Sequence, residues 1–417
     1  MKKILEFFEQ PFTALSLVLY SGGPLTVILT GGASEGEEGA AEEGDFALIQ
    51  LIFLLIYAVT FFLLVARWKK VVYLLSKDKF IWLLVAFAVV SISWSFAPQM
   101  TIRRAIALVG TTLFGLYLAT RYTMKEQLKM FGWTFCIIVV LSLIYAVLLR
   151  KYGIMGGIHT GAVRGIYTHK NILGKVMVLS IIVFLLLATE AKKNRWLLWL
   201  GFSLSLVLII LAKSTTSIAN LVIILTALQV YRTLRWRYEL MFPAIFAIAT
   251  AGTSFYLWFV ANADALLGSV GKNTTLTGRT ELWPAVLDMI WKQPWLGYGY
   301  KGFWVGWEGE SAYVWYTTRW TPPNSHNGLL DLWLDLGILG VAIFLIGFWT
   351  TLVKSMAWVR LTRTSEGLWP LLYMTYMVQA NMAESSLMIQ NDIFWVLYIA
   401  VALSVLIPPE QQTKTLT

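Results

Sequence analysis

Runs of about 20 apolar residues recur along this chain, and this repetition constrains the fold more than any other feature. Each run is long enough to cross a hydrocarbon core roughly 30 Å thick as an α-helix. Of the 417 residues, 58% are hydrophobic and only 13% are charged. A soluble protein would not expose that much apolar surface. The sequence therefore predicts an all-α polytopic membrane protein.

Hydropathy divides the chain into about twelve expected transmembrane helices. They lie near residues 11–30, 46–66, 80–97, 104–120, 131–149, 172–189, 196–212, 216–231, 240–261, 328–349, 368–388 and 391–408. One long polar insertion separates the ninth span from the tenth. The expected organisation is nine spans in 1–261, a large catalytic loop with short helices in 262–327, and three spans in 328–417.

The charges of the loops predict the orientation of the chain. With the amino terminus in the cytoplasm, alternate loops carry clusters of Lys and Arg, as the positive-inside rule requires. Both termini are then cytoplasmic, and the large loop faces outward. Cations that fall on the outer side against this bias indicate an anionic ligand there, although snorkelling to lipid headgroups explains any one of them equally well. They are Arg103, Arg104, Arg150, Lys151, Arg164, Lys170, Lys175, Lys213 and Arg279.

Composition argues against several other classes of protein. The single cysteine, Cys136, lies in an apolar run, so neither a disulfide framework nor a thiolate metal site is expected. The three histidines are too scattered to indicate a zinc site. The net charge is +10, but the sequence has no soluble domain with a basic surface stripe, so nucleic-acid binding is not expected.

Two outer segments contain residue types that bind phosphate. Arg164, His169, Lys170 and Asn171 precede or begin the sixth span, where free backbone N–H groups attract anions. A polar cap with an interfacial anchor is an equally open interpretation. Lys213 stands at the turn before the eighth span, followed by small hydroxyl residues that we expect to cap that helix and permit close helix approach.

The segment Thr277–Lys292 has apolar residues at helical spacing, which predicts a short helix on the outer membrane surface. Arg279 stands at its start, where the guanidinium and the helix end could grip one phosphate together. Many aromatic residues follow, including Tyr298. We expect most of them to form an interfacial belt, and one or two, among them Tyr298, to stack on sugar rings.

His326 is the candidate general base. Asn324 or Ser325 can cap the tenth span, which would put His326 in its first turn. A helix amino terminus disfavours the imidazolium form, so a neutral imidazole that can accept a proton is expected there.

Four further residues of the tenth span are singled out by their types. Gly337 and Gly340 would thin the helix so that another helix can pack closely. Asp331 and Asp335 lie one turn apart just inside the membrane boundary. Intramembrane carboxylates are functional candidates, and we expect these two to be partners of the outer arginines.

These residues resemble the O-antigen ligase and polymerase superfamily, and in particular its exopolysaccharide-polymerase-like branch. The most specific match is His326-Asn327 followed after nine residues by Gly337-x-x-Gly340. Arg-Gly-x-x-x-His-Lys-Asn-x-x-Gly at 164–174 is typical of that branch, and Thr-Gly-Arg-x-x-Leu-Trp with Pro-x-x-Gly-x-Gly at 277–299 supports the superfamily. Family ligases often carry an arginine where this chain has Thr215, and that departure favours a polymerase.

The resemblance implies a GT-C-like glycosyltransferase of the bacterial inner membrane that acts on the periplasmic side without metal or cofactor. The donor would be an undecaprenyl-diphosphate-linked glycan, and membrane lipids and a chain-length regulator protein would be further partners. The expected catalytic residues are His326, Arg279 and Arg164, and the expected substrate-binding residues are His169, Lys170, Asn171, Lys213, Asn327 and Tyr298.

The expected activity is polymerisation of lipid-linked repeat units with inversion at the anomeric carbon. Two alternatives stay open at this point. A ligase would share the donor and join the glycan to lipid A core or to a protein. A transporter could also have twelve spans, but it would be expected to show internal repeats and broken helices near the bilayer centre.

Overall fold

A computed structural model describes residues 2–33, 46–261 and 279–408, and among them it contains helices and no β-strand. One isolated antiparallel bridge joins Ile154 to Val163. The expected all-α class is confirmed for these residues. The acidic segment 34–45 and the start of the predicted catalytic motif, Thr277 and Gly278, lie outside them.

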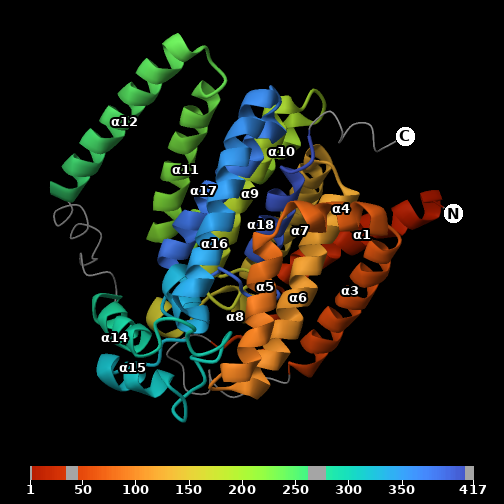
Figure 1. The fold of residues 1–417 in the computed structure, drawn as a ribbon. Coiled ribbons are helices and arrows are strands. Elements are labelled where there is room, and N and C mark those ends of the chain that lie inside the picture. The colour runs from red at the N-terminus through yellow and green to blue at the C-terminus, as the bar shows by residue number, and fades with distance from the viewer. Residues whose placement is uncertain (1, 34–45, 262–278, 409–417) are drawn as a thin grey trace.

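The helices follow one another along the chain as Figure 1 shows. The first half contains α1 (Lys2–Tyr20), α2 (Leu25–Leu29), α3 (Ala47–Val65), α4 (Trp68–Lys77), α5 (Phe80–Val90), η1 (Ser91–Trp94), α6 (Pro98–Arg121), α7 (Met124–Val147), α8 (Arg150–Gly153), η2 (Gly157–His159) and α9 (Lys170–Glu190). The second half contains α10 (Arg195–Leu211), α11 (Thr215–Thr233), α12 (Tyr238–Ala261), α14 (Arg279–Lys292), α15 (Ser311–Thr318), α16 (Gly328–Leu361), η3 (Ser365–Leu368), α17 (Trp369–Ala383) and α18 (Ile393–Ser404).

Among the described residues, five helices are long and apolar enough to cross a membrane: α3, α6, α7, α9 and α16. Three shorter apolar helices cover Phe80–Trp94, Arg195–Leu211 and Ile393–Ser404. These findings fit a polytopic membrane protein, whereas the count of twelve spans and the GT-C-like fold stay predictions.

Two of the expected spans whose bounds differ in the structure bear on the site and the bundle. The span expected at 11–30 is divided into α1 and α2, and the span expected at 368–388 ends at Ala383. Residues 384–392 are therefore a connection between α17 and α18, outside both helices. This second correction matters most, because the connection carries part of the candidate site.

The core of the bundle is built around α9 and α18. All twelve residues of α18 are buried, and this helix packs against α6. Helix α9 packs against α7, α10, α11 and α17. Figure 1 shows α12 leaning away from the bundle beyond α11, while α8, α14 and α15 gather at one end. We call this the loop end, because it also holds the segment between α8 and α9.

Gly337 interrupts α16 with a backbone that is not helical, at φ 64°. The polar loop docks in this kink: Ile338 N donates to Pro294 O at 2.8 Å, and Tyr298 N donates to Leu334 O at 2.7 Å. A Cβ on Gly337 would meet Trp295 O at 2.1 Å, and one on Gly297 would meet Leu334 O at 2.5 Å. The expectation that Gly337 admits a second helix is therefore wrong, because it admits the loop.

Candidate active site

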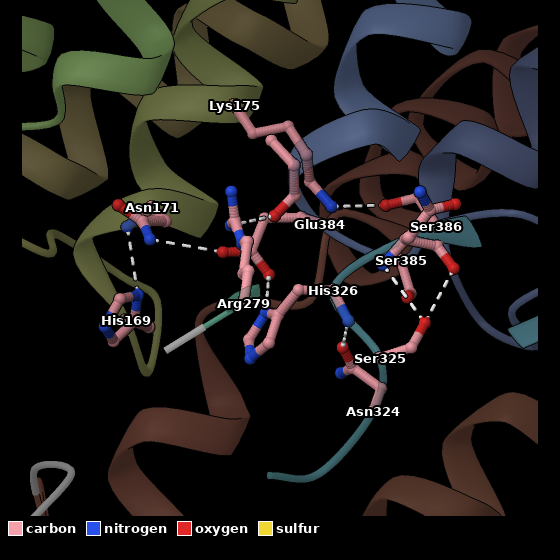
Figure 2. Close-up of polar contacts among 12 residues, drawn as sticks. His169, Asn171, Lys175, Arg279, Asn324, Ser325, His326, Glu384, Ser385 and Ser386 are labelled. Atoms are coloured by element: carbon pink, nitrogen blue, oxygen red, sulfur yellow. Dashed lines mark hydrogen bonds and ion pairs between the residues drawn. The ribbon is translucent and has the colours of Figure 1, made fainter. Parts of the chain in front are cut away.

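Four separate parts of the chain meet at the loop end (Figure 2). They are the start of α9, the start of α14, the segment before α16 and the connection after α17. Each brings polar side chains to a carboxylate from the last of these, Glu384.

The centre of this cluster is a hydrogen bond between His326 and Glu384. Nδ1 of His326 lies 3.1 Å from Oε2 of Glu384, and the two side chains are 21% and 23% exposed. An ionised carboxylate only accepts hydrogen bonds, so Nδ1 must be the donor and carry the proton. The neutral ring then keeps its lone pair on Nε2. Figure 2 shows this second nitrogen pointing away from Glu384, where an acceptor hydroxyl could reach it.

The backbone around His326 is held in an unusual conformation. His326 has φ 53°, its N–H donates to Oδ1 of Asn324 at 2.9 Å, and its ring stacks on Trp320 at 6.0 Å between centroids. The cap of α16 is Asn327, which accepts from the N–H groups of Leu329 and Leu330. The expected cap at Asn324 or Ser325 and the expected place of His326 in the first turn are wrong, because the helix begins two residues later.

Asp331 connects the segment that carries His326 to the one that carries Glu384. Its carboxylate accepts from Ser325 N and Trp304 Nε1, both at 3.0 Å, and from the hydroxyl of Ser385. Ser325 is next to His326 and Ser385 is next to Glu384, so Asp331 keeps these two candidates at a fixed separation.

The structure gives Asp331 and Asp335 other partners than the expected outer arginines. Asp331 is bound by the neutral donors just described, whereas Asp335 pairs with Lys301 Nζ at 3.0 Å and accepts from Lys301 N at 3.0 Å. Both carboxylates are buried. They hold the polar loop against α16, and neither is placed to act as the general base.

Glu384 is ionised because of its neighbours. Oε1 accepts from Asn171 Nδ2 at 3.1 Å. Burial raises the pKa of this carboxyl, but the hydrogen bond and charge of His326, the charge of Lys175 and the hydrogen bond from Asn171 outweigh burial and lower the pKa to about 2. Glu384 therefore stays negative across the range in which a bacterial enzyme works.

Arg279 reaches the same place from the first turn of α14. Its Nη2 donates to the carbonyl of Ala383, the residue before Glu384. Burial lowers the pKa of Arg279 and the Glu384 carboxylate opposes that shift, and a guanidinium stays charged in proteins. One of its nitrogens thus fixes the guanidinium beside the carboxylate, and this planar group can bind a phosphate in a two-pronged manner.

Lys175, one turn inside α9, adds a second cation. Its ammonium donates to the Ser386 hydroxyl and lies 4.6 Å from the centre of the Phe394 ring. Beside it, between α9, α11 and α17, is a polar cavity of about 10 Å³ lined by Asn171, Ser214 and Glu384 among others. That is room for about one water.

The hydroxyl residues at the start of α11 serve the site and the helix contact. A Cβ on Gly174 would meet Ser217 Oγ at 2.2 Å, so the expected close approach of α9 and α11 is confirmed. The expected side-chain cap is wrong at Ser214, which occupies the cap position without a capping bond. Its hydroxyl instead donates to Asn171 Oδ1 at 3.2 Å, so it orients the amide that binds Glu384.

Arg164 is not brought into this cluster. It is fully buried, and its guanidinium donates to the carbonyls of Gly32, Ala33, Lys151, Tyr152 and Thr168. An arginine bound to so many carbonyls fastens the segment after α2 to the segment around α8. Its expected role at the diphosphate stays a prediction, and the geometry supports a structural role.

Replacing Arg164 by leucine should lower the stability of the folded protein by about 3–5 kcal/mol, because buried carbonyls lose their donor. The stability of Arg164→Lys should lie between that of the native protein and that of Arg164→Leu, since an ammonium has fewer hydrogen-bond donors than a guanidinium. Thermal unfolding in detergent measures this, with the exposed Arg103→Leu as control. An Arg164→Lys protein of normal stability that transfers no glycan would instead restore the catalytic role.

Tyr298 lies in the core beneath the polar loop. It is 1% exposed, and its hydroxyl donates to Met289 O at 2.8 Å. It packs with Phe303 against the buried face of α14, which is formed by Leu282, Val286 and Ile290. The expected helix is confirmed at Arg279–Lys292. Burial gives Tyr298 no face for a sugar ring, so its expected sugar stacking is wrong, and stacking on exposed aromatics such as Trp307 and Tyr316 stays a prediction.

The remaining predicted residues lie around the start of α9 and α11. His169 caps α9, because its Nδ1 accepts from Asn171 N at 3.2 Å. Lys170 is the first residue of α9. Lys213 is exposed at the turn before α11, with φ 51°. In the described part of the chain, no group of three or more His, Cys, Asp or Glu side chains could hold a metal ion.

The sequence reasoning missed Glu384, Ser385 and Ser386. Their signal is a polar run, Asn381-x-x-Glu384-Ser385-Ser386, within an otherwise apolar stretch. From the sequence alone, a helix that continues through this charged residue cannot be told from a helix that ends before it. The structure shows that it stops, at Ala383.

If the protein has the expected transferase activity, replacing Glu384 by glutamine should slow it roughly 10- to 100-fold, because a charge-assisted hydrogen bond that orients the imidazole is lost. The ionised carboxylate stabilises the fold fully above its ordinary pKa of 4.5, and this stabilisation is lost as the pH falls toward about 2. The difference in unfolding temperature between the native protein and Glu384→Gln should therefore shrink below pH 4.5.

The exposed Glu281→Gln is the matched control for that experiment, since it removes a carboxylate from the same end of the protein. It should change neither the rate nor the pH dependence of stability. A difference in unfolding temperature that stays constant from pH 7 to pH 3.5 would contradict the low pKa of Glu384.

Comparison with known proteins fits this geometry. Residues 174–345, from α9 to α16, match the sequence model of the family described as O-Antigen ligase. The chain is also 22% identical over 306 residues to the "Exopolysaccharide production protein ExoQ" of Rhizobium meliloti (strain 1021). That match covers 70% of this chain and 69% of the relative.

By these matches the chain is similar to O-antigen ligase/polymerase-like membrane enzymes. The predicted resemblance to the O-antigen ligase and polymerase superfamily is confirmed in this sense, and the family model matches residues 174–345.

Proposed function

We propose that this protein is a membrane glycosyltransferase that polymerises undecaprenyl-diphosphate-linked repeat units into a surface polysaccharide. The observation that carries the proposal is the His326–Glu384 pair with Arg279 bound beside it. A positioned base and a cation next to one another are what transfer from a diphosphate requires. The ExoQ relative, named for exopolysaccharide production, supports the same direction.

In the proposed reaction, an acceptor sugar hydroxyl attacks the anomeric carbon of the donor. The new bond joins the acceptor oxygen to that carbon, and the bond from the carbon to the diphosphate oxygen breaks. Nε2 of His326 takes the hydroxyl proton, and Glu384 stabilises the imidazolium that forms. Arg279 and Lys175 stabilise the charge that develops on the leaving diphosphate. A single displacement inverts the anomeric centre.

The other proposed binding residues surround this centre. His169 and Lys170 stand at the start of α9, Asn171 orients Glu384, and Lys213 faces the same end of the bundle. Asn327 fixes the start of α16 directly after His326. His169 and Asn327 cap helix starts and Asn171 holds the carboxylate, so their contribution is positional, whereas Lys170 and Lys213 are proposed to bind the substrate.

We further propose that the loop end faces the periplasm from the inner membrane, with both termini in the cytoplasm. The basic loops at the other end of the bundle support this orientation. The proposed partners are the lipid-linked glycan, membrane lipids and a chain-length regulator protein. Accessibility of single cysteines placed at residues 307 and 193 to an impermeant thiol reagent in whole cells would test the orientation.

A ligase is the second candidate, because the matching family is described as O-Antigen ligase. The donor would be the same, and the acceptor would be lipid A core or a protein. Neither match is to a transporter.

The deciding experiment uses purified protein with a short undecaprenyl-diphosphate-linked repeat unit from its own host, without metal or nucleotide. A ladder of longer lipid-linked glycans supports the polymerase. Transfer only after lipid A core is added supports the ligase. No product with either acceptor would overturn the proposal, provided that the protein is folded.

A further inference from the structure

A second hollow at the loop end lies apart from the His326 cluster. Its volume is about 610 Å³, within the range of roughly 300–1,000 Å³ that is typical of ligand sites. One wall is the backbone after α2, at Gly31 and Gly32, and the other is formed by Arg150, Lys151 and Met155. We call it the α2–α8 pocket. Nothing in the proposed reaction uses it.

The lining of the α2–α8 pocket favours an anion. Arg150 and Lys151 are both exposed, and among the described residues none that lines the pocket is acidic. Gly31 presents bare backbone toward open space, which lets a bulky head group approach closely, whereas Gly32 packs against Lys151 O. The walls are also fixed: buried Arg164 donates to Gly32 O on one wall and to Lys151 O on the other. A fixed cationic hollow is suited to a phosphate group.

The pocket lies where a lipid would bring such a group. Helix α7 ends with the exposed apolar side chains of Val147 and Leu148, directly before Arg150. An exposed apolar turn followed by exposed cations marks the boundary between hydrocarbon and head groups. The expected anion is therefore carried on a lipid.

The pocket also adjoins the reaction centre through the start of α9. Met155 lines the pocket, and its sulfur accepts from Lys170 N at 3.4 Å. The next residue, Asn171, binds Glu384. A glycan could thus extend from the pocket to His326 along this one helix start.

We infer that the α2–α8 pocket binds the diphosphate of the acceptor. This inference rests on the proposed polymerase. Joining two lipid-linked chains needs two diphosphates: the donor's leaves at the reacting carbon, whereas the acceptor keeps its own at the membrane, one repeat unit away from the attacking hydroxyl. A ligase with a lipid A or protein acceptor needs no such second site.

The test compares the native protein with the double variant Arg150→Gln/Lys151→Gln in nanodiscs of phosphatidylcholine. Two acceptors are supplied, a lipid-linked repeat unit and the same oligosaccharide without lipid or diphosphate. The double variant should lose roughly 10- to 100-fold in kcat/KM with the lipid-linked acceptor, as expected for lost charge-assisted hydrogen bonds. It should match the native protein with the soluble one.

The control is Arg103→Gln, which removes an exposed outer cation that does not line the pocket. Equal kcat/KM of native and double variant for the lipid-linked acceptor would overturn the inference while the polymerase stands. Equal losses with both acceptors would also overturn it. If the native protein extends neither acceptor but modifies lipid A core, the proposed polymerase itself has failed.

Radiolabelled lipids separate the two sources of a lipid-borne phosphate. Undecaprenyl diphosphate should bind the native protein at one more site per molecule than it binds the double variant. If labelled phosphatidylglycerol shows the same difference and undecaprenyl diphosphate does not displace it, the pocket holds a phospholipid head group and the inference is wrong.

Discussion

Replacement of His326 by asparagine should reduce glycan transfer by about 10²–10⁴-fold, the usual contribution of a general base. Asparagine is the sharper substitution, because it accepts the left-handed backbone conformation that His326 adopts at φ 53°. Alanine would add backbone strain to the loss of the imidazole. The initial rate of ladder formation with a lipid-linked repeat unit measures the effect.

The control for this experiment is chemical rescue. His326→Gly removes the ring and tolerates the backbone, and it leaves a space against Trp320 where the ring was stacked. Imidazole added to the buffer should restore part of the rate of this variant and none of that of Arg279→Gln. If His326→Asn keeps the native rate, the proton passes to another group, and the mechanism proposed here is wrong.

Arg279→Gln should have an effect of similar size, about 10²–10³-fold, because the leaving diphosphate loses the guanidinium that is held at Ala383, next to Glu384. Arg279→Lys should lose about tenfold, since an ammonium keeps the charge but has no planar fork. Single-turnover rates with saturating donor separate this from weaker donor binding.

Lys292→Gln is the matched control, because it removes a cation from the other end of α14. It should leave the rate within about twofold of the native value, as expected for an exposed charge. Equal losses in Lys292→Gln and Arg279→Gln would show that the net charge of α14 matters rather than the guanidinium at its start.

Much of the framework could be predicted from residue patterns. The apolar positions Leu282, Val286 and Ile290 predicted α14, and all three are buried there. Long apolar runs predicted the helices, because length and hydropathy are local properties of the sequence. His326 and Arg279 could likewise be singled out from the residues next to them in the sequence, without knowledge of how far apart they lie in the fold.

Glu384 could not be predicted in the same way. It lies 58 residues from His326, so no spacing rule connects the two. Hydropathy extended the last-but-one span through it, since a window over 368–388 is still apolar on average. Where that helix ends depends on what Glu384 contacts, and those contacts come from α9 and from the segment before α16.

Arg164 shows the opposite limit of sequence reasoning. Its residue type and its place before a helix fit a phosphate ligand, and the same features fit an arginine that binds carbonyl groups. Only the positions of Gly32 and Lys151 around it distinguish the two roles. A backbone acceptor leaves no mark in a sequence, because every residue has one.

The end of α17 at Ala383 has a consequence for how the protein is made. A ribosome delivers the histidine and the arginine well before Glu384, so a partly synthesised chain already carries both. Its imidazole then has no carboxylate to fix the proton on Nδ1. The chain can thus be anchored in the bilayer, surrounded by reactive lipid-linked sugars, without premature chemistry. On the proposed mechanism, the full rate is reached only when the connection that carries Glu384 has joined the folded bundle, so completion of biogenesis raises the activity.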